Sequence, residues 1–256
     1  MPESSELRLF SHPKTSSKIL ELLGKEFSGK KILDLGAGEG GFTAALYRHI
    51  AKENVEPKQV LSACDLYPEG YKFDGIDCQK MDFSERFSFA DESFDTIVCI
   101  EVIEHIANQF RFIQEIARIT RPGGRAFIST PNILNANGRL RYFFTGTWPL
   151  FDVLPIKSHD VVHVTGHIAP ISLYYIYYFA MRAGFRECRF HIDRVKRSSL
   201  LVAPFIYAVQ PILSLHMNRR RRQKVGEAVD ENSSAIKAMN SFRILTGRTV
   251  IVEAIK

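Results

Sequence analysis

Short apolar runs alternate with segments of helical periodicity along the first half of the chain. The apolar runs are expected to be strands, and they cover residues 31–35, 59–65, 75–82, 94–101 and 125–130. Segments with apolar positions three or four residues apart predict helices at 14–27, 42–50 and 109–120. This alternation predicts an α/β fold, in which a mostly parallel sheet carries helices on both faces.

The second half of the chain is less regular. Residues 132–170 are polar and aromatic without a clear period, and we expect a long loop that contacts a substrate. An aromatic helix is predicted at 172–182, followed by strands at 185–193 and 249–255, with an insertion at 196–245 between them. The length of 256 residues fits one domain carrying this insertion.

The turn after the first predicted strand is rich in glycine. The stretch Ile32–Thr43 reads ILDLGAGEGGFT, with Gly36, Gly38, Gly40 and Gly41 between a strand and a helix. Glycine adopts positive φ at little cost and lets the backbone approach a ligand closely at a helix N-terminus. Three of the glycines satisfy G-x-G-x-x-G, a pattern that by itself permits any nucleotide-like ligand.

Four of the predicted strands deliver an acidic residue at or near their carboxyl ends. These residues are Asp34, Asp65, Asp82 and Glu101. Any one of them is explained as the N-cap of a following helix. Four in corresponding positions indicate a ligand site, because ligands of open parallel sheets bind outside the carboxyl ends of the strands.

Taken together, these residues resemble the class I S-adenosylmethionine (AdoMet) methyltransferases over most of 20–131 and at 183–185. The resemblance implies a Rossmann-like, seven-stranded, mostly parallel sheet with an antiparallel C-terminal strand, and a helical insertion between the last two strands. It places Asp34 near the methionine amino group, Asp65 on the ribose hydroxyls and Asp82 at the adenine amino group, with Phe83 supplying backbone and a stacking surface. The full implied AdoMet set is Asp34, Gly36, Ala37, Gly38, Gly40, Asp65, Leu66, Asp82, Phe83 and Glu101.

The segment 101–105, EVIEH, is the second chemical feature. Two carboxylates and an imidazole suit a divalent ion such as magnesium or zinc. The E-x-x-E-H arrangement resembles that of ubiquinone-pathway O-methyltransferases and of small-RNA 2′-O-methyltransferases, which implies a metal held by Glu101, Glu104, His105 and a later histidine. His167 is the preferred partner, ahead of His163 and His159. The alternative is a strand-end motif without metal, and in either case Glu101, His105 and His167 are the predicted catalytic residues.

The insertion combines an uncharged run with a basic cluster. Residues 199–215 carry no charge, are interrupted by Pro204 and Pro211, and are followed closely by four arginines at 219–222. From 182 to 224 there are eleven Lys or Arg against two acids, a local net charge of +9 in a chain whose total is +6. The run is too short to span a bilayer. Residues 199–222 therefore predict either an element lying on an anionic membrane surface or a helical cap over the active site.

The amino-acid composition indicates a globular protein, and the cysteine spacing bears on the cellular compartment. Hydrophobic residues make up 45% and charged residues 24%, as in ordinary globular proteins. The cysteines Cys64, Cys78, Cys99 and Cys188 have no C-x-x-C spacing, and we expect reduced thiols in a cytoplasmic protein, peripheral on the inner face of a membrane if the insertion is an anchor.

Several functions stay open at this point. The leading hypothesis is O-methylation of a small or lipid-linked acceptor, sugar-like or quinone-like. The alternatives are terminal-ribose 2′-O-methylation of RNA, a membrane-peripheral AdoMet-binding protein without catalysis, and, more remotely, a nicotinamide dehydrogenase. Nucleic acid is disfavoured because the basic charge lies beside an apolar run and is not interleaved with aromatic residues. The acceptor and the oligomeric state are not defined by the sequence.

Overall fold

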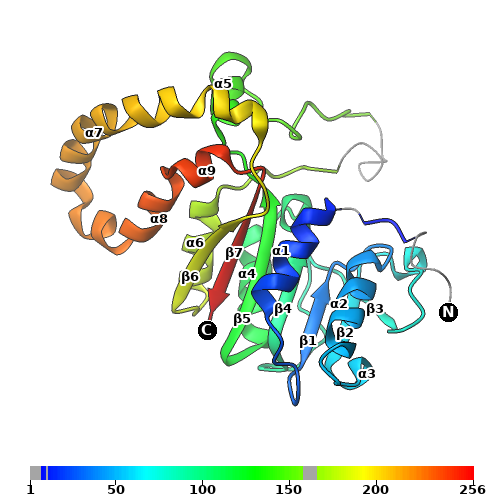
Figure 1. Cartoon of the computed structure of the whole chain (residues 1–256). Coiled ribbons are helices and arrows are strands. Elements are labelled where there is room, and N and C mark those ends of the chain that lie inside the picture. The colour runs from blue at the N-terminus through cyan, green and yellow to red at the C-terminus, as the bar shows by residue number, and fades with distance from the viewer. Residues whose placement is uncertain (1–6, 10, 158–165) are drawn as a thin grey trace.

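The computed structural model describes residues 7–9, 11–157 and 166–256, with the side chains of 211–224 excepted. A seven-stranded sheet forms its centre, with strand order β3-β2-β1-β4-β5-β7-β6 (Figure 1). The strands are β1 (Ile32–Leu35), β2 (Leu61–Asp65), β3 (Cys78–Lys80), β4 (Phe94–Ile100), β5 (Thr120–Pro131), β6 (Glu187–Ile192) and β7 (Thr249–Ile255). β7 runs antiparallel to both β5 and β6, whereas β1 to β5 pair in parallel. The predicted sheet is confirmed.

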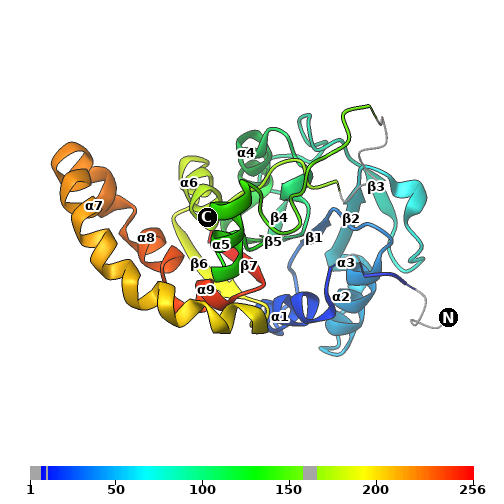
Figure 2. The same ribbon diagram turned by 90° about the horizontal axis from the view of Figure 1, so that it is seen from above.

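Helices cover both faces of the sheet, as Figure 2 shows from above. The helices α1, α2 and α3 lie on one face, and α4 and α6 lie on the other. The helical elements are α1 (Pro13–Leu23), α2 (Gly41–Ala51), α3 (Pro57–Val60), η1 (Pro68–Gly70), η2 (Ile103–His105), α4 (Gln109–Ile119), α5 (Ala136–Thr145), α6 (Leu173–Arg182), η3 (Arg197–Leu201), α7 (Ala203–Glu231), α8 (Ser233–Met239) and α9 (Phe242–Thr246).

Alternating side chains of the central strands build a separate core on each face. In β4, Cys99 packs with Phe112 and Ile176 under α4 and α6, whereas Val98 packs with Leu46 under α1 and α2. Both faces of the sheet are therefore sealed by apolar side chains. The edge at the carboxyl ends of the parallel strands is the place left for a ligand.

Two expectations about the second half of the chain are wrong. The segment 132–170 is not only loop, because it contains α5, which begins where the Asn135 side chain accepts a hydrogen bond from the Gly138 N–H (2.9 Å). Pro211 does not interrupt the insertion, since α7 passes through it and the break in helical geometry lies at Val225. Pro204 lies in the first turn of α7, where its missing N–H is not needed.

The insertion stands out from the body of the molecule. In Figure 1, α7 arcs away from the sheet and returns through α8 and α9 to β7. None of the helices in the described part of the chain is both long and apolar enough to cross a bilayer. All four cysteines are free thiols, as predicted.

Candidate active site

The glycine turn lies at the carboxyl end of β1, at the start of α2. Gly36, Gly38 and Gly40 have φ values of +86°, +55° and +89°, in the left-handed region that favours glycine. A Cβ atom on Gly36 would lie 2.3 Å from Cγ2 of Val102. Both the positive φ and the lack of room for a Cβ atom therefore require glycine at position 36.

Two carboxylates flank this turn. Asp34 is buried and accepts a hydrogen bond from the Thr43 hydroxyl (2.6 Å). Burial, with a further contribution from the charge of Asp65, raises the pKa of Asp34 to about 7. Asp65 accepts from the Gly38 N–H (2.8 Å), so the strand-end acid is tied directly to the glycine turn. Two carboxyl groups beside a glycine turn suit a ligand with hydroxyl groups and positive charge.

Asp82 and Phe83 differ from each other in exposure. The Asp82 carboxylate is exposed and accepts hydrogen bonds from the backbone N–H (2.8 Å) and the hydroxyl (2.7 Å) of Ser84, which hold its pKa below the usual value. The Phe83 ring is buried against Phe87 and Phe112 in edge-on contacts. Stacking of the Phe83 ring on a ligand is therefore wrong, and only its backbone can contribute. Leu66 packs against the same apolar core.

The segment 71–73 also contacts the glycine turn, and this contact is not among the sequence-based predictions. A Cβ on Gly40 would lie 2.8 Å from atoms of both Tyr71 and Phe73. The Tyr71 hydroxyl is buried and makes no hydrogen bond of good geometry among the described residues, although the Thr43 hydroxyl faces it; burial raises the pKa of Tyr71. Lys72 pairs with Glu39 of the turn (2.8 Å). The sequence sign of this contact is the triplet 71–73, in which a basic residue lies between two aromatic residues.

Glu101 occupies a strained position at the end of β4. Its φ is +53°, which is uncommon for a residue with a side chain and is concentrated at functional sites. Its backbone N–H donates to the Ser129 carbonyl (3.1 Å), and its carboxylate accepts from the Thr249 hydroxyl (3.4 Å). Burial, with the charge of Asp193, raises the pKa of Glu101. This conformation turns the chain from β4 into η2.

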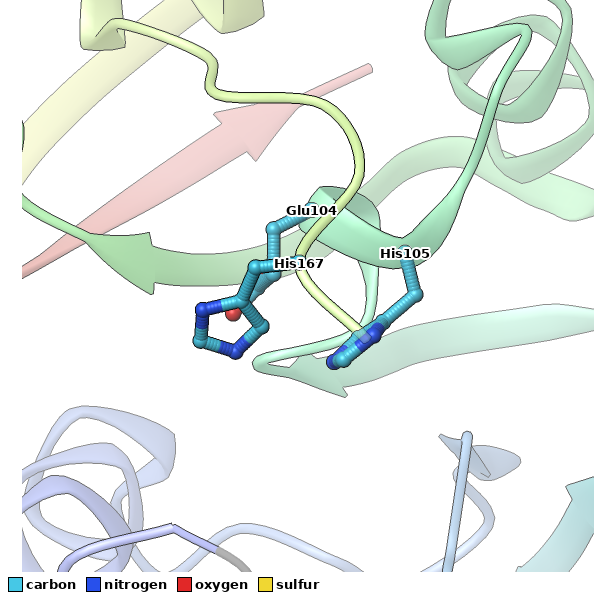
Figure 3. A group of neighbouring side chains, drawn as sticks. All are labelled: Glu104, His105 and His167. Atoms are coloured by element: carbon cyan, nitrogen blue, oxygen red, sulfur yellow. The ribbon is translucent and has the colours of Figure 1, made fainter. Parts of the chain in front are cut away.

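Glu104, His105 and His167 form a three-residue centre beyond that turn. Each offers one ligand atom, and these atoms all lie within 4.8 Å of one another. Figure 3 shows the three side chains extending from η2 and from the segment before α6 toward a common space. Glu101 does not belong to this group, and Glu104 takes the position of the buried carboxylate.

Backbone carbonyls orient both imidazoles. Nδ1 of His105 lies 2.8 Å from the Gly166 oxygen, and Nδ1 of His167 lies 2.9 Å from the Leu150 oxygen. A carbonyl only accepts, so each Nδ1 carries the proton and each Nε2 keeps its lone pair. The rings of His105 and His167 lie edge to face, with their centroids 4.9 Å apart. Burial lowers the pKa of both histidines, which keeps them neutral.

The carboxylate of the centre is the unusual member. Glu104 is completely buried, and neither of its oxygens makes a hydrogen bond of good geometry among the described residues; its own backbone N–H and the Thr130 hydroxyl face the carboxyl and only partly offset the effect of burial on its pKa. Burial raises the pKa of Glu104 to about 8. A buried carboxylate without partners is costly, and such groups ordinarily bind a proton, a metal ion or a ligand. The centre thus fits a cation or a proton shared with a substrate.

Other predicted residues have different outcomes. His159 and His163 lie outside the described residues. Asn132, directly after β5, is buried and donates to the carbonyls of Ile244 (2.7 Å) and Gly247 (3.0 Å), so it ties the end of β5 to the segment 244–247.

Comparisons with known proteins agree with this geometry. The sheet order, the antiparallel β7 and the glycine turn beside two carboxylates define a class I AdoMet-dependent methyltransferase fold. The sequence profile of a family described as "Methyltransferase domain" matches residues 8–177. The chain belongs to this family of AdoMet-dependent methyltransferases.

The similar proteins with a named activity match only part of this chain or have low sequence identity to it. A ubiquinone biosynthesis O-methyltransferase of Aeromonas salmonicida is 31% identical over 137 residues, which is 52% of this chain and 55% of that protein. The chain thus matches the curated relatives over about half their length. A methyltransferase structure from Archaeoglobus fulgidus has a TM-score of 0.57 at 15% identity and covers 94% of this chain and 93% of that one. Phosphoethanolamine N-methyltransferase 2 of Haemonchus contortus, solved with S-adenosyl-L-methionine, has a TM-score of 0.52 at 16% identity, covering 95% of this chain and 52% of that one.

Proposed function

We propose that the protein transfers the methyl group of AdoMet to a hydroxyl of a small or lipid-linked acceptor, and that Glu104, His105 and His167 activate that hydroxyl. The observation that carries the proposal is the pair of imidazoles whose Nδ1 atoms are held by backbone carbonyls, beside a buried carboxyl that makes no hydrogen bond of good geometry among the described residues. The named relatives include an O-methyltransferase, which supports oxygen as the methylated atom.

The AdoMet site of the proposal follows the glycine turn. Asp65 accepts from the ribose hydroxyls, Asp34 lies near the ammonium group, and Asp82 with the Phe83 backbone lies at the adenine. Gly36, Ala37, Gly38 and Gly40 allow the ligand to approach the backbone, as the positive φ values of three of them permit.

The reaction is an in-line displacement. The acceptor oxygen forms a bond to the methyl carbon while the carbon–sulfur bond breaks, and the electron pair stays on sulfur. The acceptor proton goes to Nε2 of His105 or His167, each held neutral and in the correct tautomer by its backbone carbonyl. Alignment of oxygen, carbon and sulfur supplies much of the acceleration.

A divalent metal fits the same three residues. Two neutral imidazoles and a carboxylate are a donor set suited to zinc and other borderline ions, and they satisfy the unpartnered Glu104 oxygens. When bound there, the ion lowers the pKa of a hydroxyl that contacts it. The hypothesis with Glu101 as a fourth ligand needs a rotation of that side chain away from Thr249.

The test uses labelled AdoMet with a panel of hydroxyl acceptors that includes phenols, sugars and RNA ending in a free ribose. We expect label in a phenol or sugar, and a loss of about a hundredfold or more in turnover in His105→Ala or His167→Ala. Transfer to nitrogen or carbon acceptors only, or full activity of both variants, would contradict the proposal. Label in RNA would favour the ribose 2′-hydroxyl instead.

Chelation decides between the metal and the metal-free forms of the centre. With a metal, dialysis against a chelator abolishes turnover and readdition of one ion restores it. The Glu104→Gln variant then loses metal affinity while AdoMet binding stays unchanged. Activity that is insensitive to both treatments would leave His105 and His167 as bases alone.

We also propose that residues 199–222 dock on an anionic membrane surface. Leu201 and Phe205 are 87% and 72% exposed where α7 leaves the body, and the arginines 219–222 lie further along the same helix. Flotation with vesicles containing phosphatidylglycerol should fall in a Leu201→Ser/Phe205→Ser variant. Equal flotation of both proteins, or none, would indicate that the helix is a cap.

A further inference from the structure

A cavity of about 610 Å³ lies between α5, the end of α8 and the segment that follows β5. Four of its lining residues belong to or follow α5, which lies beyond the carboxyl end of β5 (Figure 1). Its lining combines apolar, aromatic and basic side chains: Ile133, Leu134, Arg139, Tyr142, Phe143, Trp148, Met239 and Asn240. None of the AdoMet residues lines it, so it is a separate compartment on the same side of the sheet.

Aromatic rings form one wall of this cavity. Tyr142 and Trp148 are stacked nearly parallel, with ring centroids 4.1 Å apart and an angle of 11° between their planes. Phe143 beside them is 79% exposed. A flat apolar wall with an exposed aromatic edge is favourable for a ring or an alkyl chain, because covering it removes apolar area from water.

Arg139 supplies the only cationic group of the lining. Its guanidinium donates to the carbonyls of Leu134 (2.8 Å) and Met239 (2.6 Å), and it makes no ion pair within the described part of the chain. Burial lowers the pKa of Arg139, as expected for a cation that is desolvated without a carboxylate. By contrast, Arg141 on the same helix is paired with Asp152.

The hydrogen-bonding capacity of Arg139 is not exhausted. A guanidinium has five N–H donors, and the third contact, to the Gln210 side chain, is long at 3.5 Å. The two carbonyls hold the group in place, and its remaining donors suit a planar or tetrahedral anion. The cavity thus combines an apolar wall with a fixed positive charge.

The cavity is joined to the three-residue centre by one turn of the chain. The Phe151 N–H donates to the Trp148 carbonyl (3.1 Å), which closes the turn 148–151. The Phe151 ring lies 5.2 Å from the ring of His167, and Leu150 orients that same histidine. A ligand against Trp148 therefore lies next to the segment that positions His167.

We propose that this cavity binds the methyl acceptor, and that the acceptor is an amphipathic molecule with a ring or alkyl chain against Trp148 and a carboxylate or phosphate group at Arg139. Its identification as the acceptor rests on the proposed function, whereas binding of an anionic amphiphile does not. The anionic group sets the orientation, and the hydroxyl to be methylated extends toward His167.

The experiment uses Trp148, the single tryptophan of the chain, as the reporter. Its emission is followed during titration with hexanoate, hexyl phosphate, hexanol and hexylammonium, without AdoMet. We expect both anions to change the emission and to bind about tenfold or more tightly than hexanol, with hexylammonium weakest. The two anions distinguish a carboxylate from a phosphate as the preferred group.

Variants locate the effect. In Arg139→Gln the preference for anions over hexanol should disappear, whereas Arg186→Gln, an exposed arginine on the far side, should retain it. Equal affinity for all four probes, an unchanged emission with every probe, or an anion preference that survives Arg139→Gln would overturn the proposal. If Arg139→Gln does not fold, the comparison of probes on the wild-type protein still decides.

A separate measurement keeps this inference distinct from the proposed function. Calorimetry with AdoMet should give the same affinity for Arg139→Gln as for the wild type. Probe binding without AdoMet binding would refute the methyltransferase proposal and leave the cavity intact. AdoMet binding without probe binding would refute the cavity alone.

Discussion

The buried carboxyl of Asp34 predicts that AdoMet binding depends on pH. In the ligand-free protein, burial raises the pKa of Asp34 from 3.8 to about 7. This shift of about 3 units corresponds to about 4 kcal/mol of cost in ionising the group. An AdoMet ammonium group placed beside Asp34 offsets that cost, so binding requires the ionised carboxylate and releases a proton whenever the free site is protonated.

The magnitude follows from this linkage. Below pH 7 the free site holds the proton, and each further pH unit should weaken AdoMet binding about tenfold. Between pH 5 and 7 the ammonium group itself stays protonated, so it does not add to the slope. The stability of the ligand-free protein changes with pH in the opposite direction. The folded state holds the Asp34 proton more tightly than the unfolded chain, so its stability falls as pH rises from about 4 through 7.

The assay is calorimetry at pH 5, 6 and 7 in two buffers of different ionisation enthalpy, which gives both affinity and proton release. Asp34→Asn should bind AdoMet with an affinity that varies little over this range. Asp74→Asn, a change at an exposed carboxylate, should behave as the wild type does. A wild-type affinity independent of pH, with no proton released at pH 6, would refute the reasoning.

Three further predictions follow from the described contacts. Gly36→Ala should cost about 2–3 kcal/mol of unfolding free energy and abolish AdoMet binding, because its Cβ meets Val102. Gly29→Ala, with φ +68° but nothing within 4 Å of the new Cβ, should cost about 1 kcal/mol. Denaturant titration measures both costs and calorimetry measures AdoMet binding; equal costs would contradict the steric argument. Asn132→Ala should lower stability by about 1–3 kcal/mol, because it removes two buried hydrogen bonds and leaves the Ile244 carbonyl with only its long bond from the Gly247 N–H (3.3 Å). An unchanged denaturation midpoint would contradict this. Zinc added to chelated protein should raise the melting temperature if the three-residue centre binds it, and an unchanged melting temperature would count against a metal.

Local patterns made the turn at the carboxyl end of β1 predictable. Glycines at a strand–helix turn and acids at strand ends are dictated by backbone conformation and by the parallel sheet, so the positions of Gly36 and Asp65 could be predicted without coordinates, whereas their contact with AdoMet stays a prediction. The Phe83 ring could not be assigned correctly, because the side of the strand end to which it points depends on packing with Phe87 and Phe112.

The arrangement of the three-residue centre depended on contacts between residues distant in sequence. The E-x-x-E-H motif singled out the segment 101–105, but the positive φ of Glu101 turns its carboxylate toward Thr249 and leaves Glu104 with the histidines; a catalytic role for these residues stays a prediction. The helix α5 was missed because its apolar residues lack a clear period and it contains Asn137-Gly138, a pair typical of turns. Gly138 is needed for a tertiary reason, since a Cβ there would lie 2.7 Å from the Ile133 carbonyl oxygen.

The anchoring of the two imidazoles has a consequence for exchanging loops between relatives. Carbonyls at Leu150 and Gly166 define the histidine tautomers, and the Ala169 N–H donates to the Glu104 carbonyl (3.0 Å). A chimera that replaces everything between β5 and α6 would therefore change the acceptor surface and the proton-accepting atoms at once. Exchange confined to residues 136–148 would change most of the aromatic and basic lining of the proposed acceptor cavity and would leave all three anchors in the host chain. With those junctions we expect acceptor preference to change while the two imidazoles keep their carbonyl partners.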